Sequence, residues 1–133
     1  MIGGIRTSML VIEDELIPLS QAHNVRVIVY NPLAAGVLIG RYCWTRTFEQ
    51  NTRLTLQNSG ELYRKRYWRD PMFDALDRLA SVVEPYGQKL VEVALAGVLA
   101  QPGITCAILG ASKSEQFTES LRGVTVSLIQ GYI

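Results

Sequence analysis

The chain has 133 residues, of which 48% are hydrophobic and 19% charged, so it has the length and apolar content of one folded domain. Thirteen basic against twelve acidic residues leave a formal charge of +1, which excludes a globally basic nucleic-acid binder. Two cysteines and one histidine exclude a disulfide scaffold and a histidine-based metal site. No apolar run reaches the roughly 18–20 residues that cross a bilayer, and the N-terminus lacks a signal-peptide pattern. We therefore expect a cytoplasmic chain with no membrane partner.

The first regular elements are expected between residues 12 and 30. Apolar residues recur every three or four positions over Ile12–Ala22, which is helical spacing. Pro18 fits only near a first turn, so the regular helix is expected to start near Asp14. Val25–Tyr30 is rich in β-branched residues, and we predict a short parallel strand that is apolar on both faces apart from one arginine.

Residues 31–69 show no sustained periodicity and are predicted to form a long loop with room for a helical turn or two. Loops of this length in a compact chain usually carry function. Asp70 as an N-cap, followed by Pro71, then starts a helix, which Gly87 stops. A second helix over Lys89–Ala100 is nearly all apolar, which predicts burial on more than one side.

The last expected elements are a strand over Ile104–Leu109 and a helix capped by Ser112. Glu115 completes a capping box for this helix, and Gly123 ends it. Cys106 is expected to be buried in the strand as a small hydrophobe. Strands that alternate with helices predict parallel βα units. Two strands alone leave open edges and uncovered apolar faces, so the pattern is typical of part of a larger α/β sheet or barrel.

Both expected strands are followed by a candidate phosphate site. The small residues of Asn31–Gly36 follow the first strand, and ligands of parallel α/β folds bind at carboxyl strand ends. Gly110–Lys113 follows the second strand and opens a helix, where the dipole, the first amides and the lysine charge favour an anion. The alternatives are a plain strand-to-loop turn at the first site and simple capping by Ser112 at the second. Two such strand ends in one chain favour a nucleotide.

Three other features have structural interpretations. The basic run 64–69 includes two aromatic residues and could grip phosphates or bases. The balanced overall charge instead favours a solvated face, or a loop that packs its aromatics on a helix, so no nucleic-acid partner is expected. His23 lies at a helix end, where the dipole favours it. No Ser-His-Asp set can be assembled around this single histidine.

Four blocks of sequence carry a family resemblance. They are IEDELIPL (12–19), VYNPLAAGVLIGRY (29–42), LVEVAL (90–95), and QPGIT (101–105) continuing into ILGASKSEQ (108–116). Through these blocks, residues from about Ile12 to Leu121 resemble the C-terminal part of the aldo-keto reductase superfamily. The order and spacing of the blocks make this match far more specific than a lone glycine motif.

The resemblance implies that residues 1–133 form a single partial domain, the C-terminal half of a (β/α)8 TIM barrel, with the two strands as its seventh and eighth. It also implies NADP(H) as the cofactor, with the ring of Tyr30 stacking on the nicotinamide. The other residues expected to bind the cofactor line the pyrophosphate (Asn31, Pro32, Leu33, Ala34), reach its phosphates (Arg41, Arg53, Lys113), or hold the adenosine end (Gly110, Ser112, Gln116, Glu119, Ser120). Lys113 and Ser112 are expected to favour NADPH over NADH through the 2′-phosphate at the start of the helix.

The catalytic residues of the resembled family find no match here. They are an Asp, a Tyr, a Lys and a His from the first half of the barrel, so we interpret the chain as a truncated reductase that holds the cofactor half. Alone it is expected to be inactive, and a small-molecule carbonyl would be reduced only if the other half were supplied. The alternatives are a non-catalytic nucleotide-binding or interaction module, or a degenerate fragment. Exposed strand edges predict self-association or a complementary barrel half as the partner.

Overall fold

The computed structural model describes residues 2–3, 12–40, 52–57 and 59–126. The chain divides into two compact units. The first, here called the sheet unit, comprises Met1–Pro32 and Val91–Ile133. The second, the helical unit, comprises Leu33–Leu90. Within the described residues, no helix is long and apolar enough to cross a bilayer.

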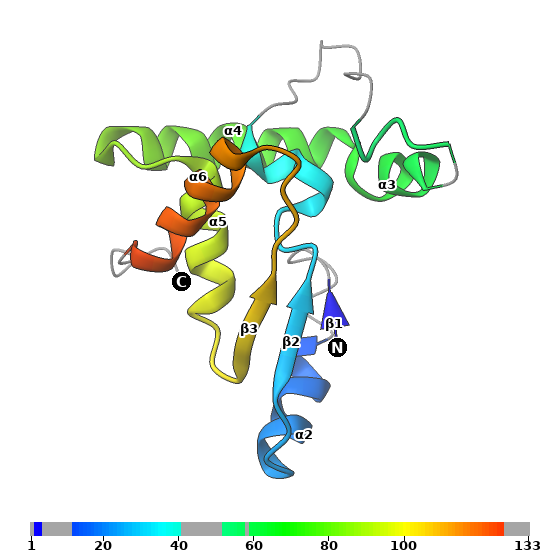
Figure 1. Ribbon diagram of the computed structural model, residues 1–133, viewed down its shortest axis with the longest axis vertical. Coiled ribbons are helices and arrows are strands. Elements are labelled where there is room, and N and C mark those ends of the chain that lie inside the picture. Colours follow the sequence, from blue (N-terminus) through cyan, green and yellow to red (C-terminus); the bar gives the residue numbers. More distant parts are fainter. Residues whose placement is uncertain (1, 4–11, 41–51, 58, 127–133) are drawn as a thin grey trace. The chain divides into compact units, whose positions relative to one another are not determined.

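The sheet unit is built on three parallel strands, β1 (Ile2–Gly3), β2 (Val27–Tyr30) and β3 (Ile104–Ile108). Their order is β1-β2-β3, and their arrows point the same way in Figure 1. The predicted parallel α/β arrangement is therefore confirmed for these strands. The sequence predicted two strands, because a two-residue strand is too short to show alternation.

One face of this sheet is exposed, contrary to the prediction that both faces are covered. Val27 and Val29 are buried, whereas Ile28 and Tyr30 are 36% and 47% exposed. The strand register pairs Ile28 with Cys106 and Tyr30 with Ile108, so these four side chains share one side, which we call the open face. The predicted burial of Cys106 is wrong for the same reason, since its side chain is exposed. Strand β2 also begins two residues later than predicted.

The N-terminal helix begins later than predicted. A π-helical segment, η1 (Ile12–Leu16), leads into α2 (Ile17–Ala22), so the regular helix does not begin near Asp14. The reason is Pro18, which has no amide proton to donate and therefore lies in the first turn. Ile12 and Ile17 are buried, and the partly buried Leu16, Val98 and Ile104 pack against them.

Helix α5 (Leu90–Leu99) matches its prediction closely, and five of its residues are buried: Val91, Glu92, Val93, Leu95 and Ala96. A tight turn connects it to β3, in which the amide of Ile104 donates to the carbonyl of Gln101 at 3.2 Å. Gly103 in this turn has φ +92°, and a Cβ there would lie 2.5 Å from Cγ2 of Ile17. Glycine is thus required both by the backbone conformation and by the close approach of α2.

Both predicted ends of helix α6 (Ser114–Thr125) need correction. Lys113 is the N-cap, in extended conformation, and makes no side-chain capping bond, so Ser112 and Glu115 form no capping box. Gly123 lies inside the helix and is buried. A Cβ at this position would come within 2.8 Å of the carbonyl oxygen of Glu92. This glycine therefore allows α6 to approach α5 closely and does not end the helix.

The helical unit contains a helix that the sequence did not predict. The predicted loop over residues 31–69 holds a 3-10 segment, η2 (Ala34–Ile39), and an eight-residue helix, α3 (Gly60–Tyr67). Helix α3 buries only Gly60 and Tyr67, so it has no apolar stripe that periodicity could reveal.

The next helix of this unit, α4 (Asp70–Val83), follows the prediction, with its proline in the first turn. Its N-cap is Arg69, which is extended, and not Asp70, which is already helical. Phe73, Leu76 and Val83 are buried. A 3-10 turn, η3 (Glu84–Tyr86), continues α4, and Gly87 ends it in the left-handed conformation at φ +65°, as predicted.

Candidate functional site

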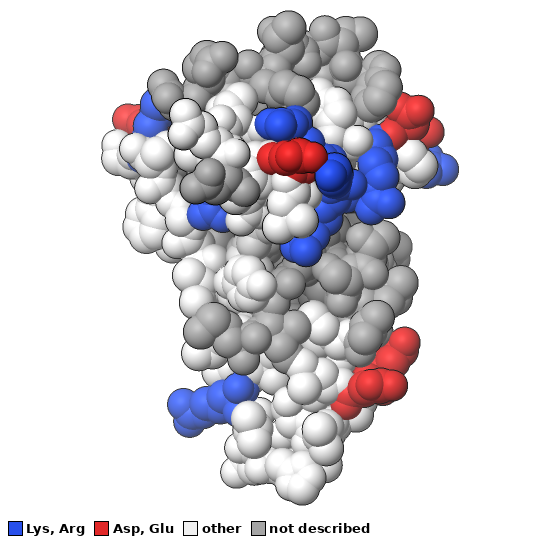
Figure 2. All heavy atoms as spheres, turned by 90° about the vertical axis from the view of Figure 1, so that its right-hand side faces the viewer, with Lys and Arg blue, Asp and Glu red and all other residues white. Residues whose placement is uncertain are grey.

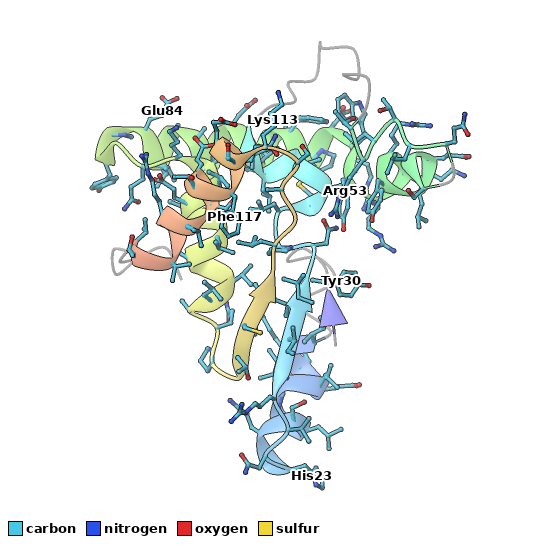
Figure 3. All side chains as sticks on the ribbon, in the orientation of Figure 1. His23, Tyr30, Arg53, Glu84, Lys113 and Phe117 are labelled. Atoms are coloured by element: carbon cyan, nitrogen blue, oxygen red, sulfur yellow. The ribbon has the colours of Figure 1, made fainter. Side chains whose placement is uncertain are left out.

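The candidate site of the sheet unit lies where β2 and β3 end. Because Tyr30 pairs with Ile108 in parallel register, the segments that follow both strands leave from the same edge of the sheet. Figure 3 shows Tyr30 at this end of β2 and Lys113 at the start of α6. The chain turns sharply after β2, since Asn31 has φ +58°, a conformation that asparagine tolerates better than most residues.

The loop before α6 is held by the side chain of Gln116. Its Oε1 accepts hydrogen bonds from the backbone amide of Ser112 at 3.1 Å and from the Ser112 hydroxyl at 3.2 Å. Two donors on one oxygen fix the orientation of the amide group, so Nε2 is the atom that can donate to a ligand. Gly110, Ser112 and Lys113 are exposed. The loop therefore presents the Nε2 group of Gln116 and the exposed ammonium of Lys113 as donors.

Charge at the start of α6 has two opposing contributions. The Lys113 ammonium and the positive end of the helix dipole favour an anion. Glu115 in the first turn opposes it. The pKa of Glu115 is lowered, first by a hydrogen bond from its own backbone amide, then by the Ser114 hydroxyl, with a smaller contribution from the Lys113 charge. A phosphate bound here would compete with this carboxylate for the helix amides.

The residues predicted to contact adenine lie further along α6. Ser120 is buried, and its hydroxyl donates to the carbonyl of Gln116 at 2.8 Å, so this hydroxyl is engaged within the helix. Glu119 is partly exposed. The adenine contacts of both residues stay predictions.

The remaining predicted residues are divided between the two units. Pro32 is buried at the end of the sheet unit. In the helical unit, Leu33 is partly buried, Ala34 is fully buried and Arg53 is exposed. Arg41 lies outside the described residues. The structure therefore brings Tyr30, Asn31 and the segment 110–116 to one edge of one sheet. Leu33, Ala34 and Arg53 belong to the other unit.

The segment that starts the helical unit has strained backbone geometry. Ala34 and Ala35 have φ +55° and +59°, and Gly36 follows at +95°. Left-handed alanine is costly because its Cβ crowds the carbonyl oxygen, and such strain concentrates at functional sites. The sequence pointed to this segment through its glycine, but nothing in it predicts left-handed alanines.

Sequence reasoning missed Ile108 as a residue of this edge. Ile108 is 48% exposed, and its partner in the strand register, Tyr30, is 47% exposed. The signal that could have found it is strand register, since parallel neighbours that end together share a face. Among the described residues, no group of three or more His, Cys, Asp or Glu side chains could hold a metal ion.

Comparisons with known proteins give a consistent result. The sequence model of the aldo/keto reductase family matches residues 4–130. An aldo-keto reductase of Pseudocercospora fijiensis is 29% identical over 116 residues, which cover 83% of this chain and 39% of that protein. Aflatoxin B1 aldehyde reductase member 2 of Homo sapiens is 30% identical over 121 residues, or 83% and 34%. A probable voltage-gated potassium channel subunit beta of Arabidopsis thaliana is 28% identical over 115 residues, or 86% and 34%. The chain thus spans between a third and two fifths of these relatives.

Proposed function

Because this chain belongs to the aldo/keto reductase family, we propose that it is the NADP(H)-binding part of an oxidoreductase that reduces carbonyl compounds. The observation that carries the proposal is the edge where β2 and β3 end in register, with the Ser112–Gln116 loop and Lys113 beside it. We further propose that the three parallel strands belong to a (β/α)8 barrel, whose carboxyl strand ends are where such folds bind ligands.

The residues at this edge fit the adenosine end of the cofactor. The Lys113 ammonium and the start of α6 favour a phosphate dianion at its 2′ position. The Nε2 group of Gln116 donates to a phosphate oxygen, and the Ser112 hydroxyl can rotate to do the same. At the other end of the cofactor, the exposed Tyr30 presents a flat apolar ring on which the nicotinamide can stack.

When bound, NADPH supplies the hydride that reduces a carbonyl carbon. The acid that protonates the carbonyl oxygen would come from a segment outside these residues, since no tyrosine of this chain matches the family's catalytic motif. This chain would bind and orient the cofactor.

A second candidate is a nucleotide-binding subunit of a larger assembly, without catalysis of its own. It is favoured by the relatives named as potassium channel subunits beta, of which the protein of Arabidopsis thaliana is one. Carbonyl-dependent oxidation of NADPH by the protein that contains this chain would support the reductase and count against the second candidate.

Replacing Lys113 by glutamate is expected to weaken NADPH binding about tenfold and to change NADH binding by less than about twofold. The reason is that only NADPH has the 2′-phosphate that the ammonium would attract, and about 1.4 kcal/mol corresponds to tenfold in affinity. The measurement is a fluorescence titration of each cofactor. Arg122→Glu is the matched control, because it makes the same change of charge in the last turn of the same helix. An equal loss for both cofactors would show that the 2′-phosphate is not recognised here.

A further inference from the structure

A second charged surface lies on helix α3 of the helical unit, and none of its residues is assigned to the cofactor. Helix α3 and the two residues after it carry four basic side chains, Arg64, Lys65, Arg66 and Arg69, and one acidic one, Glu61. Figure 2 shows Lys and Arg side chains gathered around an acidic group over this helix. We call these five side chains, together with the exposed Leu62, the α3 basic surface.

The charges of this surface are unevenly neutralised. Lys65 pairs with Glu61 at 2.8 Å, and the pKa of Glu61 is lowered, first by the hydrogen bond from Lys65, then by its charge and, less, by that of Arg64. Arg64 donates to the carbonyl of Leu54. Among the described residues, neither Arg66 nor Arg69 forms an ion pair, and the guanidinium of Arg69 donates only to the carbonyl of Arg66, at 2.9 Å. Two exposed guanidinium groups thus lack a carboxylate.

The aromatic residues of this run are used inside the unit. Tyr67 is 1% exposed, and the ring of Tyr63 stacks on it at 6.2 Å between centroids. The ring of Trp68 meets that of Phe73 edge to face at 5.0 Å. Single-stranded nucleic acids are held by aromatic faces that stack on bases, whereas the rings of Tyr67 and Trp68 pack against Tyr63 and Phe73. The surface is therefore a poor nucleic-acid platform despite its charge.

An exposed apolar side chain lies one helical turn from Arg66. Leu62 is 56% exposed and stands one helical turn before Arg66, on the same side of α3. Arginine binds carboxylates through two parallel hydrogen bonds, and an exposed leucine adds apolar contact. Stable membrane binding requires a larger apolar face than one exposed leucine on an eight-residue helix. The chemistry that fits this surface is a peptide with carboxylates next to aliphatic side chains.

We propose that the α3 basic surface binds an acidic, leucine-containing segment of a partner protein, with Arg66 and Arg69 holding its carboxylates and Leu62 contacting its aliphatic side chain. This interaction uses none of the residues assigned to the cofactor, so it can be tested separately from cofactor binding.

The test is fluorescence anisotropy of a labelled peptide, Glu-Glu-Leu-Glu-Glu-Leu, with the full chain at low ionic strength. The double variant Arg66→Glu/Arg69→Glu is expected to weaken binding more than about tenfold, since two charge pairs become repulsive. The control Arg78→Glu/Arg122→Glu makes the same change of net charge at exposed positions on α4 and α6 and is expected to change binding by less than about twofold. Leu62→Ser is expected to weaken binding severalfold. Circular dichroism confirms folding, and Arg66→Gln/Arg69→Gln serves if the reversal unfolds the chain.

Three results would overturn the proposal. The first is equal loss of peptide binding in the test and control double variants. The second is tighter binding to phosphatidylserine vesicles or to single-stranded oligothymidine than to the peptide. The third is self-association that light scattering detects and Arg66→Glu/Arg69→Glu abolishes, which would identify a second copy of the chain as the occupant.

Discussion

Replacing Gly103 by alanine is expected to lower the free energy of unfolding by about 3 kcal/mol. Two costs add at this position. The residue has φ +92°, which an L side chain rarely adopts, and the new Cβ would lie 2.5 Å from Cγ2 of Ile17. Ile17 is buried and cannot swing aside without disturbing its neighbours. The measurement is urea unfolding followed by circular dichroism.

Gly87 supplies the matched control for this variant. It also has positive φ, at +65°, but no atom of the residues that the structure describes lies within 4 Å of its Cβ position. Gly87→Ala should therefore cost only the backbone term, about 1 kcal/mol. If Gly103→Ala and Gly87→Ala lowered the free energy of unfolding equally, the turn before β3 would not be packed tightly against α2.

The isolated chain is expected to self-associate through its open face, and Ile108→Lys is expected to reduce the association constant more than tenfold. Ile28, Tyr30 and Ile108 are 36%, 47% and 48% exposed on one side of the sheet. Contiguous apolar surfaces of a few hundred Å² usually mark interfaces or aggregation sites. A lysine buried in such an interface loses its hydration without gaining a charged partner. A cost of about 1.4 kcal/mol is already enough to lower the association constant tenfold. Light scattering over a concentration series measures the effect.

The control for the open face is Val124→Lys. Val124 is 59% exposed on α6, so this variant replaces an exposed apolar residue outside the sheet by the same charged one. Association that falls equally in both variants would point to general solubility as its cause. A monomeric wild-type chain that melts cooperatively at high temperature would refute the association and favour a self-sufficient small domain.

Local signals in the sequence predicted several elements well. Pro71 marks the start of α4, and Gly87 ends the 3-10 turn that continues this helix, so both act through local backbone conformation. The nearly all-apolar run of α5 predicted its burial without knowledge of its neighbours. Such features are local because they depend on a few adjacent residues.

The sequence predictions were wrong where contacts between distant parts of the chain decide the local structure or burial. The sequence predicted that Gly123 ends the helix. Gly123 instead lies within α6, where the absence of a side chain allows the backbone of Glu92 to pack closely against it. Cys106 reads as buried, and only the register with Ile28 shows that it lies on the open face. Helix α3 carries so many charges that no periodic signal marked it.

The candidate site was predicted in part. The sequence placed the candidate phosphate-binding segments after the two strands, and parallel register brings Tyr30 and the segment 110–116 to one edge. It did not predict that Ser112 donates two hydrogen bonds to the side chain of Gln116. A serine at this position is equally typical of a simple helix cap, so the sequence alone does not indicate the bonds to Gln116. The hydroxyl of Ser120 also bonds within α6, which depends on helix geometry that composition does not specify.

Calorimetric titration of the chain with adenosine 2′,5′-bisphosphate and with AMP tests most directly whether the edge at the ends of β2 and β3 recognises the 2′-phosphate of NADP(H). These fragments engage the adenosine end alone, so the result does not depend on the helical unit. The bisphosphate is expected to bind about tenfold more tightly than AMP, because in the proposed site Lys113, Gln116 and the start of α6 would bind its 2′-phosphate. Equal affinities, or no binding of either fragment to a chain that circular dichroism shows to be folded, would contradict the proposed cofactor site.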